Sequence, residues 1–206
     1  FPLLETVPVY ESSERTLADA ADELPAEYTD LRHLAKTLIP GNLSLYKHQW
    51  DSLYSALVGG KDIVVTTGTG SGKTEAFLLP LLAQLALESA TWQPSGPLPS
   101  GRFWWNDGND WSPQWAHVKR PAALRAVILY PLNALVEDQL RRLRQTLDHP
   151  TVHGWLDTQR GGNRITFGRY TGLTPVPGDP SNRNKRDVLR RELTQMQQQF
   201  EQIQPK

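Results

Sequence analysis

The chain has 206 residues, of which 38% are apolar and 21% are charged, so it is long enough for one globular domain and not disordered in composition. It contains no cysteine, which excludes disulfide frameworks, cysteine nucleophiles and thiolate metal sites. The formal net charge is zero, but residues 1–60 hold nine acidic and four basic residues, whereas residues 141–206 hold six acidic and twelve basic ones. A basic C-terminal third favours contact with phosphate groups, and a solvated surface is the alternative.

No apolar run reaches the roughly 18 residues of a membrane span, so we expect no membrane contact. The chain begins with Phe1 and shows no signal peptide, and we expect it to be a piece of a longer protein. The lack of cysteine fits a reducing compartment, so a cytoplasmic location is expected.

The N-terminal part, residues 1–42, is expected to be a lead-in to the main domain. Its first 15 residues carry prolines and polar residues without periodicity, which indicates an extended segment. Residues 16–38 predict two short helices separated by Pro25. Residues 44–58 predict a further helix with apolar positions available for burial.

From residue 62 onward, short apolar segments alternate with helical patterns. The predicted strands, rich in β-branched residues, are 62–66, 126–130 and 164–170. The predicted helices between them are 73–87 and 133–147. This alternation predicts an α/β fold with a parallel sheet and flanking helices, in a domain that spans residues 43–175.

Two stretches do not belong to a minimal α/β unit. Residues 89–121 form a long insertion with several prolines and five tryptophans, Trp92, Trp104, Trp105, Trp111 and Trp115. A small satellite core is the first interpretation of these aromatic residues, and docking of a partner protein or stacking on nucleic-acid bases are the alternatives. Residues 176–206 predict a polar, glutamine-rich helix from about Arg183 to Ile203.

A glycine-rich segment between the first predicted strand and its helix carries the strongest chemical signal. This phosphate loop consists of Thr67, Gly68, Thr69, Gly70, Ser71, Gly72, Lys73 and Thr74. Glycines allow the backbone to turn tightly with its N–H groups inward, and the following helix N-terminus favours an anion. We predict that Lys73 contacts the β- and γ-phosphates and that Thr74 binds the accompanying Mg²⁺. A glycine-rich turn without a ligand is the alternative.

The neighbouring residues narrow the class of nucleotide-binding protein. Residues 69–80 resemble motif I of superfamily 2 helicases and translocases of the DEAD/DEAH-box kind, and Leu45-Tyr46-Lys47-His48-Gln49 resembles their Q-motif region. The resemblance implies the first RecA-like domain of a P-loop NTPase, with ATP and Mg²⁺ as cofactors. It also implies that Gln49 hydrogen-bonds adenine and that Tyr46 packs near the base.

Two later segments resemble nucleic-acid-binding motifs of the same family. Residues 129–139 resemble motif Ia, and residues 168–172 resemble an Arg-x-Thr-Gly segment that follows it. The resemblance implies contacts with the nucleic-acid backbone, DNA being favoured over RNA, from Pro131, Leu132, Asn133, Arg169, Thr171 and Gly172. Asn133 is also a candidate helix cap, and an ordinary surface ion pair is the alternative for the arginine.

The amino-acid sequence around motif Ia is closer to one branch of the superfamily. It resembles the large Lhr-like helicases, including those of bacterial anti-phage defence islands such as DISARM. The resemblance implies an ATP-dependent helicase or translocase whose partners are nucleic acid, the remaining motor domains of the same chain and defence-complex subunits.

No Asp-Glu-x-His or Asp-Glu-Ala-His sequence is present. Phosphoryl transfer needs that motif and a second motor domain, so we expect these residues by themselves to bind ATP weakly and not to hydrolyse it at a useful rate. The alternative function is a non-motor nucleotide-binding or protein-interaction module that uses the tryptophan-rich insertion.

Overall fold

The structure is a computed structural model that describes residues 9–68, 70–96, 103–106, 110–112, 116–172, 174 and 181–203. The chain divides into two compact units, each described here by itself. The first unit contains Phe1–Gln93 and Ala122–Phe167, and the second contains Pro94–Pro121 and Gly168–Lys206. No helix within the described ranges is long and apolar enough to cross a membrane.

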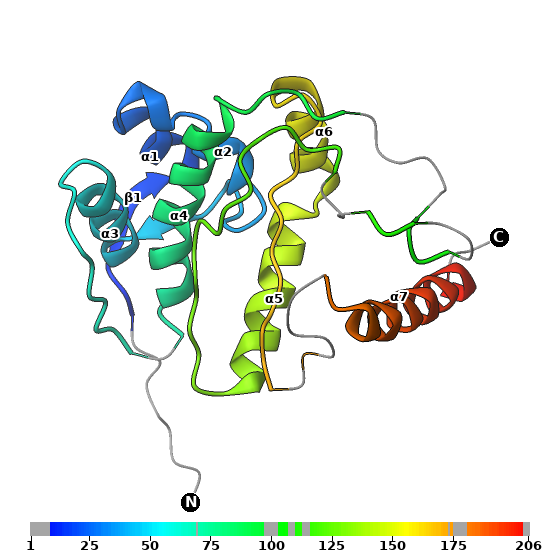
Figure 1. Cartoon of the computed structure of the whole chain (residues 1–206). Helices are drawn as coiled ribbons and strands as arrows, with labels where there is room; N and C mark the ends of the chain where they lie inside the picture. The colour runs from blue at the N-terminus through cyan, green and yellow to red at the C-terminus, as the bar shows by residue number, and fades with distance from the viewer. Residues whose placement is uncertain are drawn as a thin grey trace, which may run out of the picture. The chain divides into compact units, whose positions relative to one another are not determined.

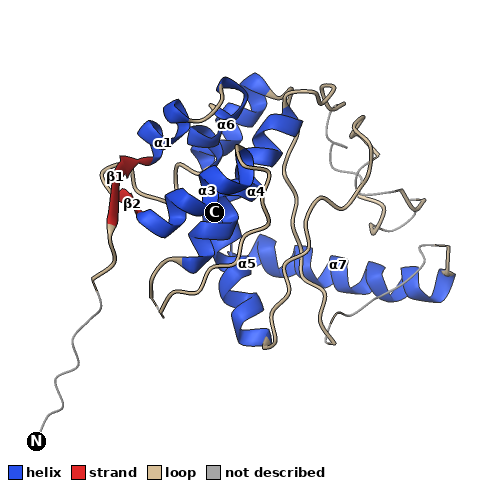
Figure 2. Cartoon of the chain, turned by 90° about the vertical axis from the view of Figure 1, so that its left-hand side faces the viewer, coloured by secondary structure: helices blue, strands red, loops and turns tan. Residues whose placement is uncertain are grey.

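The N-terminal segment forms helices where the sequence predicted them. The elements are β1 (Ser12–Thr16), α1 (Leu17–Glu23), a 3₁₀ turn (Ala26–Tyr28) and α2 (Leu31–Leu34). Thr16 caps α1 in a capping box with Asp19, in which each side chain pairs with the other residue's backbone N–H. The strand β1 was not predicted, and it pairs antiparallel with β2 (Ser44–Tyr46), as Figure 2 shows.

The core of the first unit lies between these N-terminal helices and three later ones. Helix α3 (Lys47–Leu57) packs on α4 (Lys73–Ser89), and α6 (Pro150–Gln159) packs on α2 (Figure 1). The buried side chains of this core include Leu31, Leu34, Leu53, Leu79, Leu82, Val152 and Leu156. Residues 17–39 therefore contribute to the same core as the phosphate-loop helix α4.

Arg160, just after α6, ties three helices of the first unit together. Its guanidinium forms an ion pair with Asp30, and its Nε donates to Ser89 Oγ at 2.8 Å. The same guanidinium lies 4.4 Å from the ring centre of Trp155, whose other stacking partner is His33 at 5.3 Å. Because the Arg160 side chain is only 9% exposed, removal of either charged partner would leave the other partly buried without a counterion.

The predicted parallel sheet is not confirmed, because the described residues contain no parallel pair of strands. Segments 62–66, 126–130 and 164–170 are extended but form no strand, and β1 and β2 are the two strands that the described ranges contain. Several of their apolar side chains stay exposed, with Val64 at 87% and Leu129 at 86%. A strand needs a neighbour about 4.8 Å away to pair its N–H and C=O groups, and these segments do not pair with one another.

The two long predicted helices of the α/β pattern and the C-terminal helix did form. Helix α4 has nearly its predicted extent, α5 (Asn133–Leu147) has its predicted extent, and α7 (Arg183–Ile203) begins and ends as expected. The helical period of 3.6 residues is a local signal, so it survives where sheet pairing does not.

In the second unit, residues 103–106 of the insertion pack on α7. Trp105 donates its indole N–H to Gln197 at 2.7 Å, and Phe103 stacks on Trp105 with ring centres 4.4 Å apart. Trp104 is 5% exposed. These contacts agree with the satellite-core interpretation for residues 103–106, whereas Trp115 lies outside the described residues.

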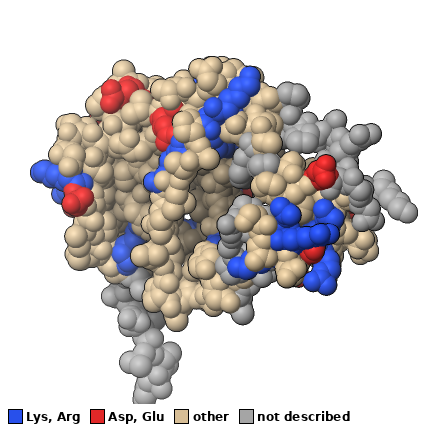
Figure 3. Space-filling model, in the orientation of Figure 1, with Lys and Arg blue, Asp and Glu red and all other residues tan. Residues whose placement is uncertain are grey.

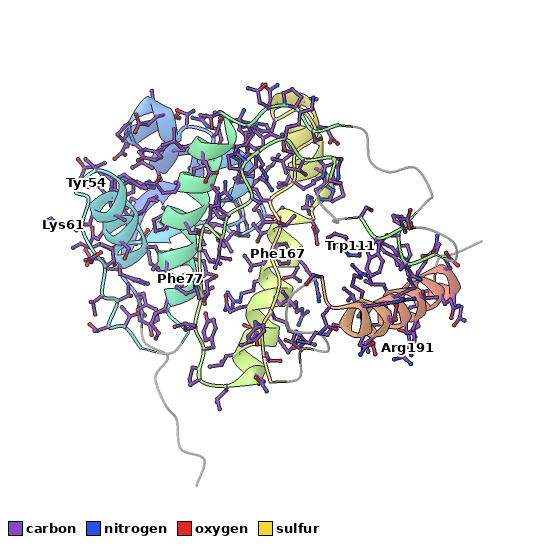
Figure 4. All side chains as sticks on the ribbon, in the orientation of Figure 1. Tyr54, Lys61, Phe77, Trp111, Phe167 and Arg191 are labelled. Atoms are coloured by element: carbon purple, nitrogen blue, oxygen red, sulfur yellow. The ribbon has the colours of Figure 1, made fainter. Side chains whose placement is uncertain are left out.

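Helix α7 also carries much of the basic charge of the C-terminal third. Figure 3 shows Lys and Arg gathered over it, and Figure 4 shows Arg191 pointing away from the insertion residue Trp111. The basic residues of its first half are Arg183, Lys185, Arg186, Arg190 and Arg191.

The half-buried imidazole of His33 makes the stability of the first unit depend on pH. Burial lowers the pKa of His33 below its ordinary 6.5, since desolvation outweighs the nearby Asp30, and Arg32, Lys36 and Arg160 add to the lowering. The unfolded chain therefore takes up this proton first, and stability is lost as pH falls below about 6.5. We predict that the unfolding free energy drops between about pH 7.5 and about pH 5.5, and drops less in His33→Phe, which keeps the ring stack on Trp155. Urea unfolding of the wild type and of His33→Phe at the two pH values checks this prediction. An equal loss of unfolding free energy in the two proteins would contradict it.

Candidate functional site

The phosphate loop connects an extended segment to the first turn of α4. Gly70 and Gly72 have φ angles of 76° and 75°, a region that glycine adopts without steric cost. Gly72 is the N-cap of α4, so Lys73 and Thr74 are the first residues of that helix. Thr69 lies outside the described residues. The sequence prediction of a turn followed by a helix N-terminus is confirmed at the other positions.

Hydrogen bonds from side chains of the phosphate loop to other residues of the loop hold it in a closed conformation. Lys73 Nζ donates to the backbone oxygens of Thr67 and Gly68, both at 2.6 Å. The Thr67 and Ser71 hydroxyls lie 2.6 Å apart, and Ser71 is 1% exposed. The ammonium group therefore lies over the loop, where a bound phosphate would compete with the two carbonyl groups for it.

Gln49 joins α3 to the phosphate loop. Its Nε2 donates to Gly72 O at 3.1 Å, and its Oε1 accepts from the Tyr46 N–H at 2.9 Å. The residue is 5% exposed. A primary amide has two N–H donors and two lone pairs, so one N–H and one lone pair remain beyond these two bonds. Gln49 thus lies at the phosphate loop and has a structural role that the sequence did not predict, and its implied contact with adenine stays a prediction.

A group of aromatic rings flanks Gln49 on the side of the N-terminal segment. Tyr46 stacks on His48 with ring centres 5.7 Å apart, and Tyr10 meets both rings edge-on. A Cβ built on Gly68 would lie 2.8 Å from the Tyr10 hydroxyl, so this ring reaches the phosphate loop. Sequence reasoning missed Tyr10 and His48, and only the pairing of β1 with β2 brings Tyr10 here.

An open cavity of about 710 Å³ lies against the loop. Its polar wall is formed by Gln49 and residues 70–75, and its apolar wall by residues 38–40, Leu43 and Tyr46. This size and mixed lining are typical of small-molecule sites. Residues 38–40 of the apolar wall come from the segment after α2, which the sequence prediction had assigned to the lead-in, whereas Leu43 and Tyr46 belong to the predicted motor domain.

Helix α5 supplies the remaining side of the site. Gln139 Nε2 donates to Thr74 Oγ1 at 3.3 Å, and Arg142 pairs with Glu75 at 2.7 Å and with Asp138 at 3.2 Å. Arg142 also lines the cavity. Neither residue was among the predicted site residues. Their spacing of three on a predicted helix, with Gln139 at the end of motif Ia and Arg142 just after it, was the available signal, since such residues share a helix face.

The residues predicted to contact nucleic acid are divided between the two units. Pro131, Leu132 and Asn133 lie exposed in the first unit at the start of α5. The N-cap is Leu132, without a side-chain cap, so the predicted capping role of Asn133 was wrong.

The second predicted contact belongs to the other unit. Gly168–Gly172 lies there, and the Thr174 hydroxyl accepts from the Thr171 N–H at 2.9 Å. The predicted contacts at Arg169, Thr171 and Gly172 stay predictions.

The residues around Thr74 fit a metal ion that arrives with a nucleotide. The described residues contain no cluster of three or more His, Cys, Asp or Glu that could hold a metal alone. One hydroxyl beside a phosphate site matches Mg²⁺, which prefers oxygen ligands and is bound by one or two protein groups together with substrate phosphates and waters.

Comparisons with known proteins show the family to which the chain belongs. Residues 46–166 match the family of DEAD/DEAH box helicases, and the chain belongs to this family. That membership implies a RecA-like α/β fold. The chain is also similar to the Druantia protein DruE of Escherichia coli (strain UMEA 4076-1), with 36% identity over 193 residues. The match covers 91% of this chain and 9% of DruE, and no solved structure matches significantly.

A side chain at residue 72 is predicted to destabilise the protein more than a side chain at residue 70. A Cβ on Gly72 would lie 2.3 Å from Gln49 Nε2, whereas a Cβ on Gly70 meets nothing within 4 Å. Both positions have positive φ, so alanine costs about 1–2 kcal/mol at each. We predict that Gly72→Ala costs about 1 kcal/mol more than Gly70→Ala, because it also displaces the hydrogen-bonded Gln49 amide.

Urea unfolding of the two variants measures this difference. In a Gln49→Ala background the extra cost of Gly72→Ala should shrink, because the clashing atom is gone. Equal destabilisation by the two glycine substitutions in the wild-type background would show that the contact with Gln49 carries no energy.

Proposed function

We propose that this chain is the ATP-binding part of the first motor domain of an ATP-dependent nucleic-acid helicase or translocase. The observation that carries the proposal is the phosphate loop at the start of α4, with Lys73 and Thr74 beside a cavity of about 710 Å³. A helix N-terminus with inward N–H groups binds phosphate, and membership of a helicase family supplies the reaction class.

In this proposal Lys73 exchanges its two backbone carbonyl partners for phosphate oxygens, which carry more negative charge. The Thr74 hydroxyl binds Mg²⁺, which neutralises phosphate charge when bound. The apolar wall formed by Pro40, Leu43 and Tyr46 receives the adenine ring, and the N–H and lone pair left on Gln49 pair with its edge.

Nucleic acid is proposed to bind at the start of α5, with DNA favoured over RNA. Pro131, Leu132 and Asn133 are exposed there, and the N-terminal end of α5 favours a backbone phosphate. Arg169, Thr171 and Gly172 are proposed as a second backbone contact, and the basic face of α7 adds positive charge in the second unit.

A role in anti-phage defence is proposed from the similarity to the Druantia protein DruE and from the amino-acid sequence of motif Ia. Defence-complex subunits and further motor domains of the same protein are the proposed partners. Hydrolysis and movement are proposed for the protein that contains them, because the sequence carries no Asp-Glu-x-His motif.

The alternative of a protein-interaction module rests on the tryptophan-rich insertion. In the second unit Trp104 is buried and Trp105 donates to Gln197, so these two rings already pack within this chain. That packing favours the motor interpretation over the alternative.

The test of the proposal is loss of ATP binding in Lys73→Ala. Removal of a charge-assisted contact costs about 1.5–3 kcal/mol, so the dissociation constant should rise roughly 10- to 100-fold. Titration of the 206-residue chain with a fluorescent ATP analogue and Mg²⁺ measures it. The matched control is Lys61→Ala, an exposed lysine of the same unit (Figure 4), which should bind as the wild type does. Equal affinity of Lys73→Ala and wild type would refute ATP binding at this loop.

A second measurement addresses the motor function. ATPase rates of the protein that contains this chain are compared without nucleic acid and with DNA or RNA. Stimulation by DNA, abolished by Lys73→Ala, is the expected result. ATP turnover that no nucleic acid changes would contradict the motor assignment.

A further inference from the structure

Gln139 is a buried polar residue, and only one of the two polar atoms of its side-chain amide makes a hydrogen bond within the described residues. It lies on α5 and is 8% exposed, and its Nε2 donates to Thr74 Oγ1 at 3.3 Å. Its Oε1 is fully buried and makes no hydrogen bond within the described residues. A buried carbonyl oxygen without a partner costs about 1–3 kcal/mol, so its presence needs a reason.

The Nε2 bond has a defined effect on the Thr74 hydroxyl. A hydroxyl oxygen has two lone pairs and one proton, and the Gln139 N–H occupies one of the lone pairs. One lone pair stays available for a cation, and the hydroxyl is held in the orientation that the amide imposes. Groups that orient a metal ligand in this way affect metal affinity strongly.

The unpaired Oε1 is an acceptor in the same amide group whose Nε2 donates to the Thr74 hydroxyl. A phosphate oxygen offers it no proton, whereas a water molecule of a Mg²⁺ hydration shell does. Mg²⁺ at nucleotide sites keeps several such waters.

The position of α5 against α4 does not depend on Gln139 alone. Arg142, one helical turn further on, pairs with Glu75, whose side chain is 14% exposed. Two adjacent residues of α4, Thr74 and Glu75, are thus held by two residues three apart on one face of α5. Loss of the Gln139 amide therefore leaves the helix pair in place.

We propose that Gln139 is a positioning residue for Mg²⁺, which presents the Thr74 hydroxyl to the ion and accepts a hydrogen bond from one of its bound waters. The inference rests on the proposed function, since it requires a nucleotide with its metal at this loop. It connects the start of α5, the proposed nucleic-acid contact, with the metal ligand of the phosphate loop.

The experiment measures binding of a fluorescent ATP analogue to the 206-residue chain, with Mg²⁺ and with EDTA. The variant is Gln139→Met, which keeps the volume and removes both polar atoms. Its affinity with Mg²⁺ should fall about tenfold or more, and its metal-free affinity should stay as in the wild type. Gln145→Met, on the exposed face of the same helix, is the matched control and should change neither value.

A double-mutant cycle with Thr74→Val separates positioning from general damage. Valine keeps the shape of threonine without its hydroxyl, so Gln139→Met should have little further effect on the Mg²⁺ dependence in that background. Additive losses, or equal losses with and without Mg²⁺, would overturn the role of Gln139. Wild type that binds no nucleotide overturns both this inference and the ATP site, whereas wild-type binding with an unaffected Gln139→Met overturns this inference alone.

Discussion

The missing side chain at residue 72 is the constraint on which the candidate site depends. The left-handed backbone of Gly72 starts α4, and the space where a Cβ would lie is filled by the Gln49 amide. That amide joins the N-terminus of α3 to the phosphate loop, so the loop and the proposed base-binding wall are held by one hydrogen-bonded side chain. A closed loop of this kind is preorganised, and less ordering free energy opposes ligand binding.

The N-terminal segment is part of the site as well as of the core. The pairing of β1 with β2 places Tyr10 against Gly68 and beside Tyr46, and residues 38–40 supply the apolar wall of the cavity. The Arg160 side chain, through its ion pair with Asp30 and its hydrogen bond to Ser89, holds α2 and α6 on the end of α4. The helicase family match begins at residue 46, so residues 38–40 and Leu43 of the apolar wall lie outside the matched residues, whereas Tyr46 lies within them.

Helix α5 connects the two proposed binding functions. The exposed residues proposed to hold a nucleic-acid backbone lie at its N-terminal end, and its second and third turns carry Gln139 and Arg142 against Thr74 and Glu75. These two contacts join the start of α4 to the helix whose N-terminal end is proposed to bind nucleic acid.

The sequence by itself determined the turn and helix start of the phosphate loop and the extents of α5 and α7, because these depend on glycine conformations and on helical periodicity along the chain. The helicase family followed from the resemblance of short motifs, among them residues 69–80 and 129–139. The phosphate-loop pattern predicted Lys73 and Thr74, and the resemblance to the Q-motif region implied Gln49. Only the tertiary structure decided which distant residues join them, namely Tyr10, Gln139 and Arg142. It also decided that the segments predicted as parallel strands stay unpaired, since strand formation depends on a neighbouring strand and not on β-branched composition alone.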